Sequence, residues 1–232
     1  MTETSTSYPV SVSVDYPDRP LDRLTTFFRP ILVIPIVIVY SLLNPSSETP
    51  LRPSDLVTDA HAQFFSYADY DSTGDWEHNH WDVGPLVMLP TILMLLFRRK
   101  YPRWWFDWNV ALTRFGIRIV AYIALLRDEY PSVEEEQSVH IAIEYPDAAS
   151  ELNRWLPLVK WLLAVPHYLV LLVMSVAACL CVIFAWFAII FTGTYPRACF
   201  DFVVGILRWW LRVSGYAFLL VTDRYPPFSL KA

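Results

Sequence analysis

Three side chains that could bind a metal ion lie close together in an acidic part of the chain. His78, His80 and Asp82 alternate, and in an extended chain this alternation places all three on one face. Imidazole and carboxylate ligands together suit Zn, Fe, Cu or Mn, and His61 could complete the ligand set. Because the spacing differs from that of helical HExxH sites and of zinc fingers, an acidic, solvated loop is the competing interpretation. No other cofactor is predicted.

A polar stripe on a helix is a second candidate site, and it occurs twice. At about 100° per residue, one aspartate and two arginines fall on one line of an otherwise apolar, aromatic-rich helix. Three interpretations remain open: the stripe faces the cytosol, its aspartates and arginines pair between the two copies, or its arginines hold anionic lipid headgroups through forked hydrogen bonds to phosphate. The two stripes are Asp107, Arg114, Arg118 and Asp201, Arg208, Arg212.

The composition predicts that a membrane protein carries these residues. The chain has 232 residues, of which 55% are hydrophobic and only 18% charged, and its mean hydropathy is +0.34. Soluble domains are nearer one quarter charged. The pI of about 5.5 argues against a nucleic-acid-binding protein, and three cysteines are too few for a disulfide-stapled scaffold.

Long apolar segments must position the candidate residues. One of them, residues 156–191, would reach roughly 54 Å as a straight helix, which exceeds a hydrocarbon core of about 30 Å. The length therefore predicts a helical hairpin that turns near residues 174–178. The other apolar segments are residues 27–43, 83–97 and 104–126.

Much of the chain is an internal duplication. The stripes recur at one constant offset, whereas earlier motifs recur at a larger one, so the first copy contains an insertion that matches residues 44–82. We predict a single membrane domain in which residues 10–43 and 83–131 form the first repeat and residues 139–232 the second. The recurring motifs include Tyr16-Pro17-Asp18 and Tyr145-Pro146-Asp147, Arg29 and Lys160, Tyr101-Pro102-Arg103 and Tyr195-Pro196-Arg197, and Asp128 and Asp223.

Each copy begins with a short segment in which apolar residues alternate with other residues. This period of two predicts a strand in each copy, and the two strands could pair into a small sheet that needs cover on one face. The predicted fold is therefore a mainly α membrane protein of two parallel tandem repeats, each with a strand, a transmembrane helical hairpin and an amphipathic interfacial helix. The alternating residues are Val10, Val12, Val14 and Val139, Ile141, Ile143.

The paired motifs resemble those of a bacterial membrane family, domain of unknown function 4389. The resemblance rests on the two Tyr-Pro elements, the apolar segments, the two Tyr-Pro-Arg elements and the ending Thr222-Asp223-Arg224-Tyr225-Pro226-Pro227-Phe228. It covers most of the chain except residues 44–82. The resemblance implies an integral membrane protein of bacteria and implies no activity.

Charge predicts which parts of the chain lie on each side of a membrane. Basic residues border the apolar segments everywhere except at residues 44–82, which hold eight acidic residues and one basic residue. The positive-inside rule then places both termini in the cytoplasm of a multi-pass protein of the plasma (inner) membrane, and residues 44–82 outside.

The expected function is that of a non-enzymatic accessory or scaffold subunit of a membrane complex. Trp and Tyr supply large contact areas for protein partners and for lipid interfaces, and Trp76 and Trp81 could dock a partner. The alternative is a protein that binds lipid headgroups or a metal ion, and the third hypothesis is a metal-dependent membrane enzyme. The expected partners are membrane lipids and another protein or a second copy, and not nucleic acid.

Overall fold

The computed structural model describes residues 8–43, 90–132, 135, 137–148, 150 and 152–231. Within them the chain is mainly helical and has one small sheet. The metal candidates His61, His78, His80 and Asp82 and the docking candidates Trp76 and Trp81 lie outside the described residues. The elements are β1 (Val10–Val14), α1 (Arg23–Leu32), α2 (Ile34–Leu43), η1 (Met94–Arg98), α5 (Arg103–Ile123), β2 (Val139–Ile143), η2 (Leu156–Leu158), α6 (Lys160–Leu163), α7 (Val165–Thr192) and α8 (Arg197–Ala217).

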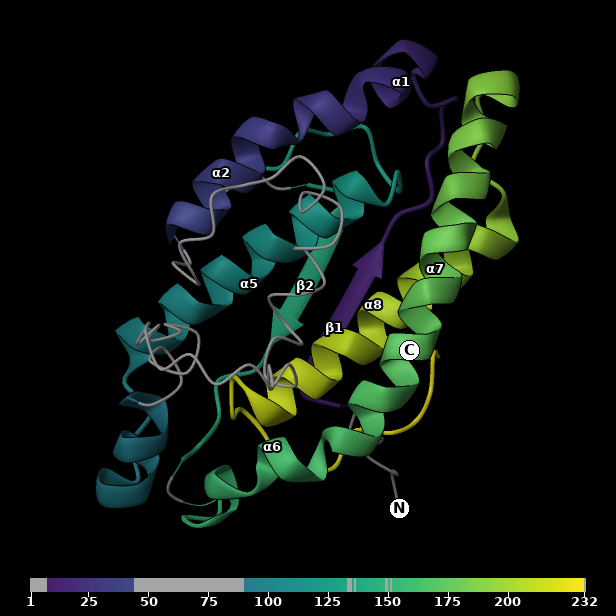
Figure 1. The fold of residues 1–232 in the computed structure, drawn as a ribbon. Coiled ribbons are helices and arrows are strands. Elements are labelled where there is room, and N and C mark those ends of the chain that lie inside the picture. Colours follow the sequence, from purple (N-terminus) through teal and green to yellow (C-terminus); the bar gives the residue numbers. More distant parts are fainter. Residues whose placement is uncertain are drawn as a thin grey trace, which may run out of the picture.

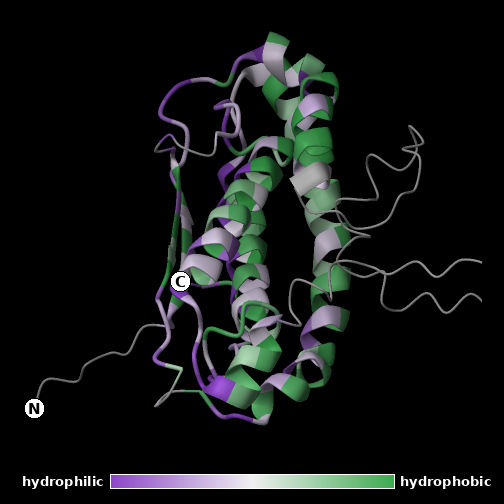
Figure 2. Cartoon of the chain, turned by 90° about the vertical axis from the view of Figure 1, so that its left-hand side faces the viewer, coloured by the Kyte–Doolittle hydropathy of each residue, from purple (hydrophilic) through white to green (hydrophobic). Residues whose placement is uncertain are grey.

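These elements form three layers. Strand β1 packs on α8 and β2 on α5, while α7 packs on the other side of α8 and α2 on α5 (Figure 1). Viewed from the side, the sheet lies at one surface, the helices α5 and α8 lie in the middle, and the most hydrophobic helices lie at the opposite surface (Figure 2). We call α1, α2, α6 and α7 the apolar layer.

The sheet confirms the alternation seen in the sequence. β1 pairs with β2 in an antiparallel arrangement whose register sets Val10 opposite Ile143 and Val14 opposite Val139. Val10, Val12 and Val14 are buried while Ser11 and Ser13 are exposed, so one face of the ribbon covers the middle helices. A two-stranded ribbon is marginal alone in water, and α8 and α5 provide the cover that it needs.

The two amphipathic helices also form where the sequence predicts them. α5 and α8 each have 21 residues, and each begins directly after a proline, Pro102 or Pro196, whose fixed φ suits the start of a helix. Both are followed by a leucine with positive φ, 61° at Leu125 and 56° at Leu220, where the chain turns away. The polar side of each helix is only partly exposed, because β1 covers part of α8 and β2 covers part of α5.

The predicted helical hairpin in residues 156–191 is wrong. α7 runs without interruption through 28 residues, and Met174 and Ala178 lie inside it. The helix has no glycine or proline between His167 and Thr192, so nothing in its backbone favours a turn there. The helix stops at Gly193, whose φ of 77° is left-handed, as is common after helix ends.

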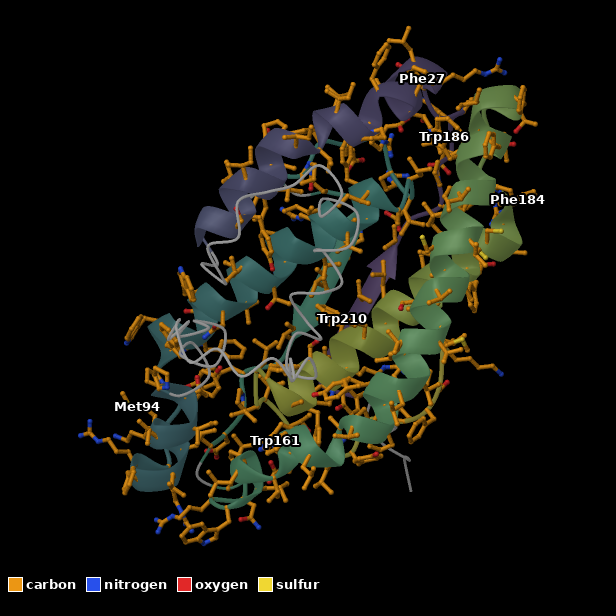
Figure 3. The ribbon with its side chains drawn as sticks, viewed as in Figure 1. Phe27, Met94, Trp161, Phe184, Trp186 and Trp210 are labelled. Atoms are coloured by element: carbon orange, nitrogen blue, oxygen red, sulfur yellow. The ribbon has the colours of Figure 1, made fainter. Side chains whose placement is uncertain are left out.

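Among the described residues, two helices are long and apolar enough to cross a membrane, residues 23–41 and Val165–Thr192. Unlike the core helices of soluble proteins, they are mostly uncovered: only 11% of the most apolar window of the second one is buried. α1 packs against α7, where Phe27 stacks on Trp186 at 6.1 Å between ring centroids (Figure 3). Phe184 of α7 is 60% exposed on the outer surface.

Candidate functional site

The polar stripes lie on the middle layer, and their two aspartates are exposed. Asp107 and Asp201 stand near the beginnings of α5 and α8. No ion pair within 4.0 Å joins either aspartate to a described arginine. The pairing of Asp with Arg that the sequence suggested is thus not formed in the described part of the chain.

On α8 the protein itself occupies both arginines. Arg208 Nε donates to the carbonyl oxygen of Val12 in β1 at 3.0 Å. Arg212 is 7% exposed, and its guanidinium donates to the carbonyl oxygens of Ser229 and Lys231 at 3.3 and 2.6 Å. These bonds fasten β1 and the C-terminal segment to α8, which is a structural task.

On α5 the corresponding arginines are much less engaged. Arg118 Nη1 donates to the carbonyl oxygen of Ser132, its Nε is buried without a hydrogen-bond partner, and no hydrogen bond is formed by the Arg114 guanidinium among the described residues. Both side chains line a cleft of about 420 Å³ that they share with β-strand residues including Ser13 and His140. Among the described residues the Arg114 guanidinium therefore has no partner, and the Arg118 guanidinium is only partly occupied.

Electrostatics make this cleft suitable for an anion. Burial, and to a smaller degree the positive charge of Arg114, lowers the pKa of Arg118, and the negative charge of Glu129 opposes this shift in part; an arginine stays charged at any physiological pH. Two like charges on one helix turn repel each other, and an anion between them relieves that repulsion. His140 is held by Asp15 at 3.2 Å, and its exposed ring could approach the same ligand.

Two buried cations, each paired with an aspartate, were not predicted from the sequence. Arg29 is 2% exposed and forms an ion pair with Asp128, and Lys160 is fully buried and pairs with Asp223 at 2.7 Å. Arg29 also donates to two backbone carbonyl oxygens and Lys160 to one. Each cation lies over a tyrosine ring of the middle layer, Arg29 at 4.6 Å from the centroid of Tyr122 and Lys160 at 5.2 Å from that of Tyr216. The matched recurrence of Arg29 with Lys160 and of Asp128 with Asp223 was the available signal, but we interpreted these cations as groups flanking a membrane segment.

A tyrosine that follows each strand forms a hydrogen bond to a distant part of the chain. Tyr16 follows β1, yet its hydroxyl donates to the carbonyl oxygen of Tyr195 at 2.5 Å, and Arg197 lies 4.0 Å above its ring. Tyr145 follows β2, and its hydroxyl donates in the same way to the carbonyl oxygen of Tyr101. Each strand is therefore anchored to the start of a helix that is distant in sequence.

A buried histidine differs from its surroundings in α7. His167 is fully buried, and its Nδ1 accepts a hydrogen bond from Trp209 Nε1 at 3.1 Å. The imidazole stacks on Phe228, with ring centroids 3.9 Å apart, and lies near Tyr225. Because Nδ1 is the acceptor, Nε2 carries the proton of the neutral ring, and it has no hydrogen-bond partner. This aromatic enclosure fastens the C-terminal segment to α7 and α8.

The metal hypothesis gains no candidate from the described part of the chain. Within residues 8–43, 90–132 and 137–231, apart from the few not described there, no group of three or more His, Cys, Asp and Glu side chains could hold a metal ion. The transition-metal prediction for His61, His78, His80 and Asp82 stays a prediction, because those residues lie outside this part.

Comparison with known proteins gives one match. Residues 155–229, about a third of the chain, match the sequence profile of a family described as Domain of unknown function (DUF4389). This match supports the resemblance inferred from the motifs over the second half of the chain. No curated protein and no solved structure matches the chain.

Proposed function

We propose that this protein is a non-enzymatic membrane protein that seats its apolar layer in lipid and presents its sheet side to another protein of a membrane complex. The observation that carries the proposal is the segregation of surfaces. Large exposed hydrophobic side chains cover α1, α2, α6 and α7, whereas the opposite surface carries serine and histidine residues of the strands and the acidic residues Asp15 and Glu144 that directly follow them. An apolar surface this extensive indicates a membrane or protein contact.

The exposed apolar side chains favour lipid as the occupant of this surface. Leu169, Val173, Val176, Leu180 and Phe184 are each at least 59% exposed along α7. They recur at helical spacing over most of the helix and include no charged residue. A uniform aliphatic and aromatic surface of this kind matches the hydrocarbon of a bilayer, which offers no hydrogen-bond partners.

The layering further favours an orientation in which α7 lies along the bilayer surface and does not cross the bilayer. The sheet lies beside α8, and α8 lies beside α7, so a crossing α7 would draw the sheet to the same depth. The two free strand edges would then expose unpaired backbone groups to hydrocarbon at a cost of several kcal/mol each. A helix of 28 residues would also extend about 42 Å, which is longer than a hydrocarbon core of about 30 Å.

Cysteine labelling from one side of the membrane tests this seat. In a variant without Cys179, Cys181 and Cys199, single cysteines at Ser150, before the N-terminal end of the apolar segment, and at Thr192 and Ser13 are treated with a membrane-impermeant maleimide in intact vesicles. We expect all three to react from the same side, while a cysteine at Val173 does not react. Ser150 and Thr192 reacting from opposite sides would show that α7 crosses, and Val173 reacting as readily as Ser13 would refute the contact with lipid altogether.

The partner-binding part of the proposal has its own experiment. Purification in a mild detergent should retain a stoichiometric protein partner or a second copy. Exposed strand residues are the contact that we expect, so Ser13→Lys and His140→Glu should release the partner, and Arg19→Gln should not. A single empty chain at every detergent concentration would refute the accessory role.

A second candidate function is anion binding by α5. Its support is the cleft at Arg114 and Arg118, whose α8 counterparts are occupied by carbonyl oxygens. Arg114→Ala with Arg118→Ala should reduce the anionic lipid that co-purifies with the protein. Unchanged lipid content would remove this candidate.

A further inference from the structure

We propose that a different cleft, between Arg99 and residues 150 and 152–155, binds a phosphate-bearing anion at the boundary of the membrane. The inference rests on the proposed seating of the apolar layer in lipid and adds a ligand to it. The cleft has a volume of about 510 Å³ and lies where the end of η1 meets the segment that leads into η2. Its lining includes two arginines, Arg99 and Arg154, which the polar stripes do not contain.

Two positive charges in this cleft lack a partner within the described chain. Asp223 also lines the cleft, but it is committed to Lys160 at 2.7 Å and to the backbone N–H of Asn153 at 2.5 Å. The guanidinium groups of Arg99 and Arg154 form no hydrogen bond or ion pair with any described residue. Guanidinium groups bind phosphate oxygens in a two-pronged geometry, so the unpartnered pair fits a phosphate group.

The end of α7 is comparable with the end of η1, because each helix is followed by a residue in the left-handed conformation. At the end of α7 another segment packs against this residue and closes the junction. There the left-handed residue is Gly193, its carbonyl oxygen accepts from Leu21 N–H at 2.9 Å, and a Cβ atom would lie 3.5 Å from Pro20. After η1 the left-handed residue is Arg99, with φ of 49°, and an open cleft takes the place of this contact.

Arg99 accepts a backbone conformation that a glycine would adopt more easily. Side chains with a Cβ atom are disfavoured at positive φ, and residues held there often mark sites of function. The conformation aims the chain so that Arg99 and Arg154 border one volume.

The surroundings of the cleft match the headgroup level of a bilayer. Trp155 lines the cleft and is 65% exposed. Leu158 of η2 and Trp161 of α6 follow it in the chain and are also exposed apolar residues; Trp161 is labelled in Figure 3. Tryptophan is enriched where hydrocarbon meets water, and basic residues beside it favour anionic lipid. A lipid bound here places its phosphate in the cleft and its acyl chains along α6.

Calorimetric titration of the full chain in dodecyl maltoside tests the site. The probes are diheptanoyl phosphatidylglycerol, inorganic phosphate and diheptanoyl phosphatidylcholine. We expect saturable binding of phosphatidylglycerol with an affinity that falls at least tenfold in Arg99→Gly/Arg154→Gln. The control Arg19→Gln/Lys231→Gln removes two exposed charges outside the cleft and should bind as the wild type does.

The probes separate the two sources of phosphate. Phosphatidylglycerol binding far more tightly than inorganic phosphate identifies a lipid ligand, and equal affinities identify a free phosphate ligand at the same site. The proposal is overturned if the cleft variant retains wild-type affinity for phosphatidylglycerol, if the control loses as much, or if phosphatidylcholine binds the wild type as tightly as phosphatidylglycerol does.

Further measurements keep these outcomes distinct from misfolding and from failure of the membrane proposal. Glycine suits the left-handed conformation at position 99, and Arg99→Lys/Arg154→Lys, which preserves both charges, should recover part of the affinity. Partition into the Triton X-114 detergent phase reports lipid seating separately. A wild type that enters the detergent phase without binding any phosphate probe overturns only the cleft, and one that stays in the aqueous phase overturns both proposals.

Discussion

The first half of the described chain, residues 8–132, and the second, residues 137–231, build the same contacts from different side chains. Each half buries a cation over a tyrosine ring and pairs it with an aspartate, but the first uses Arg29 and the second Lys160. In both halves the aspartate also accepts from a backbone N–H, that of Asp22 or that of Asn153. A contact that survives a change of residue type is one that the fold requires.

The positions that differ between the halves are those where a function can reside. His167 and Trp209 form a hydrogen-bonded pair in the second half, whereas Ile36 and Phe115 form an apolar cluster in the first. The guanidinium of Arg114 is unoccupied, whereas that of Arg208 is bonded to β1. The comparison therefore distinguishes polar groups that stabilise the fold from polar groups that are free to bind a ligand. Substitutions at both kinds of position test this distinction.

The largest effect is expected at the buried cations. Asp223→Ala leaves Lys160 buried with one carbonyl acceptor, which should lower the free energy of unfolding by about 3–5 kcal/mol. Asp128→Ala leaves Arg29 with two carbonyl acceptors, so the loss should be smaller, about 1–3 kcal/mol. Denaturant unfolding in detergent measures both, with the exposed Asp18→Ala as the control. A loss no larger than the control's at either position would show that the pair is not structural.

The next effect concerns the histidine pair. Trp209→Phe removes the hydrogen bond that His167 Nδ1 accepts and should cost about 1–3 kcal/mol. Copying the first half with His167→Ile and Trp209→Phe together should cost less than the two single losses added, because the polar atoms disappear as a pair. Strict additivity in this double-mutant cycle would mean that the two side chains do not stabilise each other.

The two stripes should respond unequally to alanine. Arg212→Ala breaks the bonds to Ser229 and Lys231 and should cost about 1–3 kcal/mol, while Arg114→Ala should stay within about 0.5 kcal/mol of the wild type. Thermal unfolding of the two variants checks the order. The reverse ranking would place the structural role on α5.

The smallest effect is expected where the two junctions differ in backbone. Gly193→Ala places a side chain at φ of 77° and should destabilise by about 1 kcal/mol. Arg99→Gly relieves the same conformation and should stabilise by about 0.5 kcal/mol. Unfolding midpoints of the two variants should shift in opposite directions, and shifts of one sign would contradict the difference in strain.

Local patterns in the sequence were sufficient to predict most secondary structure. The alternation at Val10–Val14 and Val139–Ile143 predicted both strands, and the arginine spacing predicted the helices α5 and α8. The hairpin was wrong because the argument from length assumed that every long apolar segment must cross a bilayer. The continuous α7 shows that the absence of helix-breaking residues was the better local guide.

The candidate site was predictable in its residues but not in its contacts. The spacing of Arg208 and Arg212 indicated a polar stripe, yet their acceptors lie in β1 and in the C-terminal segment, which no local pattern connects to α8. The cleft at Arg99 and Arg154 was equally inaccessible, because it depends on how two distant segments meet.

The hydrogen bond between Tyr16 and Tyr195 constrains the order in which parts of the chain can fold during synthesis. Tyr16 emerges early from a ribosome, but the carbonyl oxygen that it binds belongs to Tyr195, so the first strand must wait for most of the polypeptide. At about 5–20 residues per second this delay lasts on the order of ten seconds or more. Throughout that interval the apolar helices already synthesised lack the complete sheet and middle helices that cover them on one side. Early contact with lipid or with a chaperone would protect these helices from aggregation.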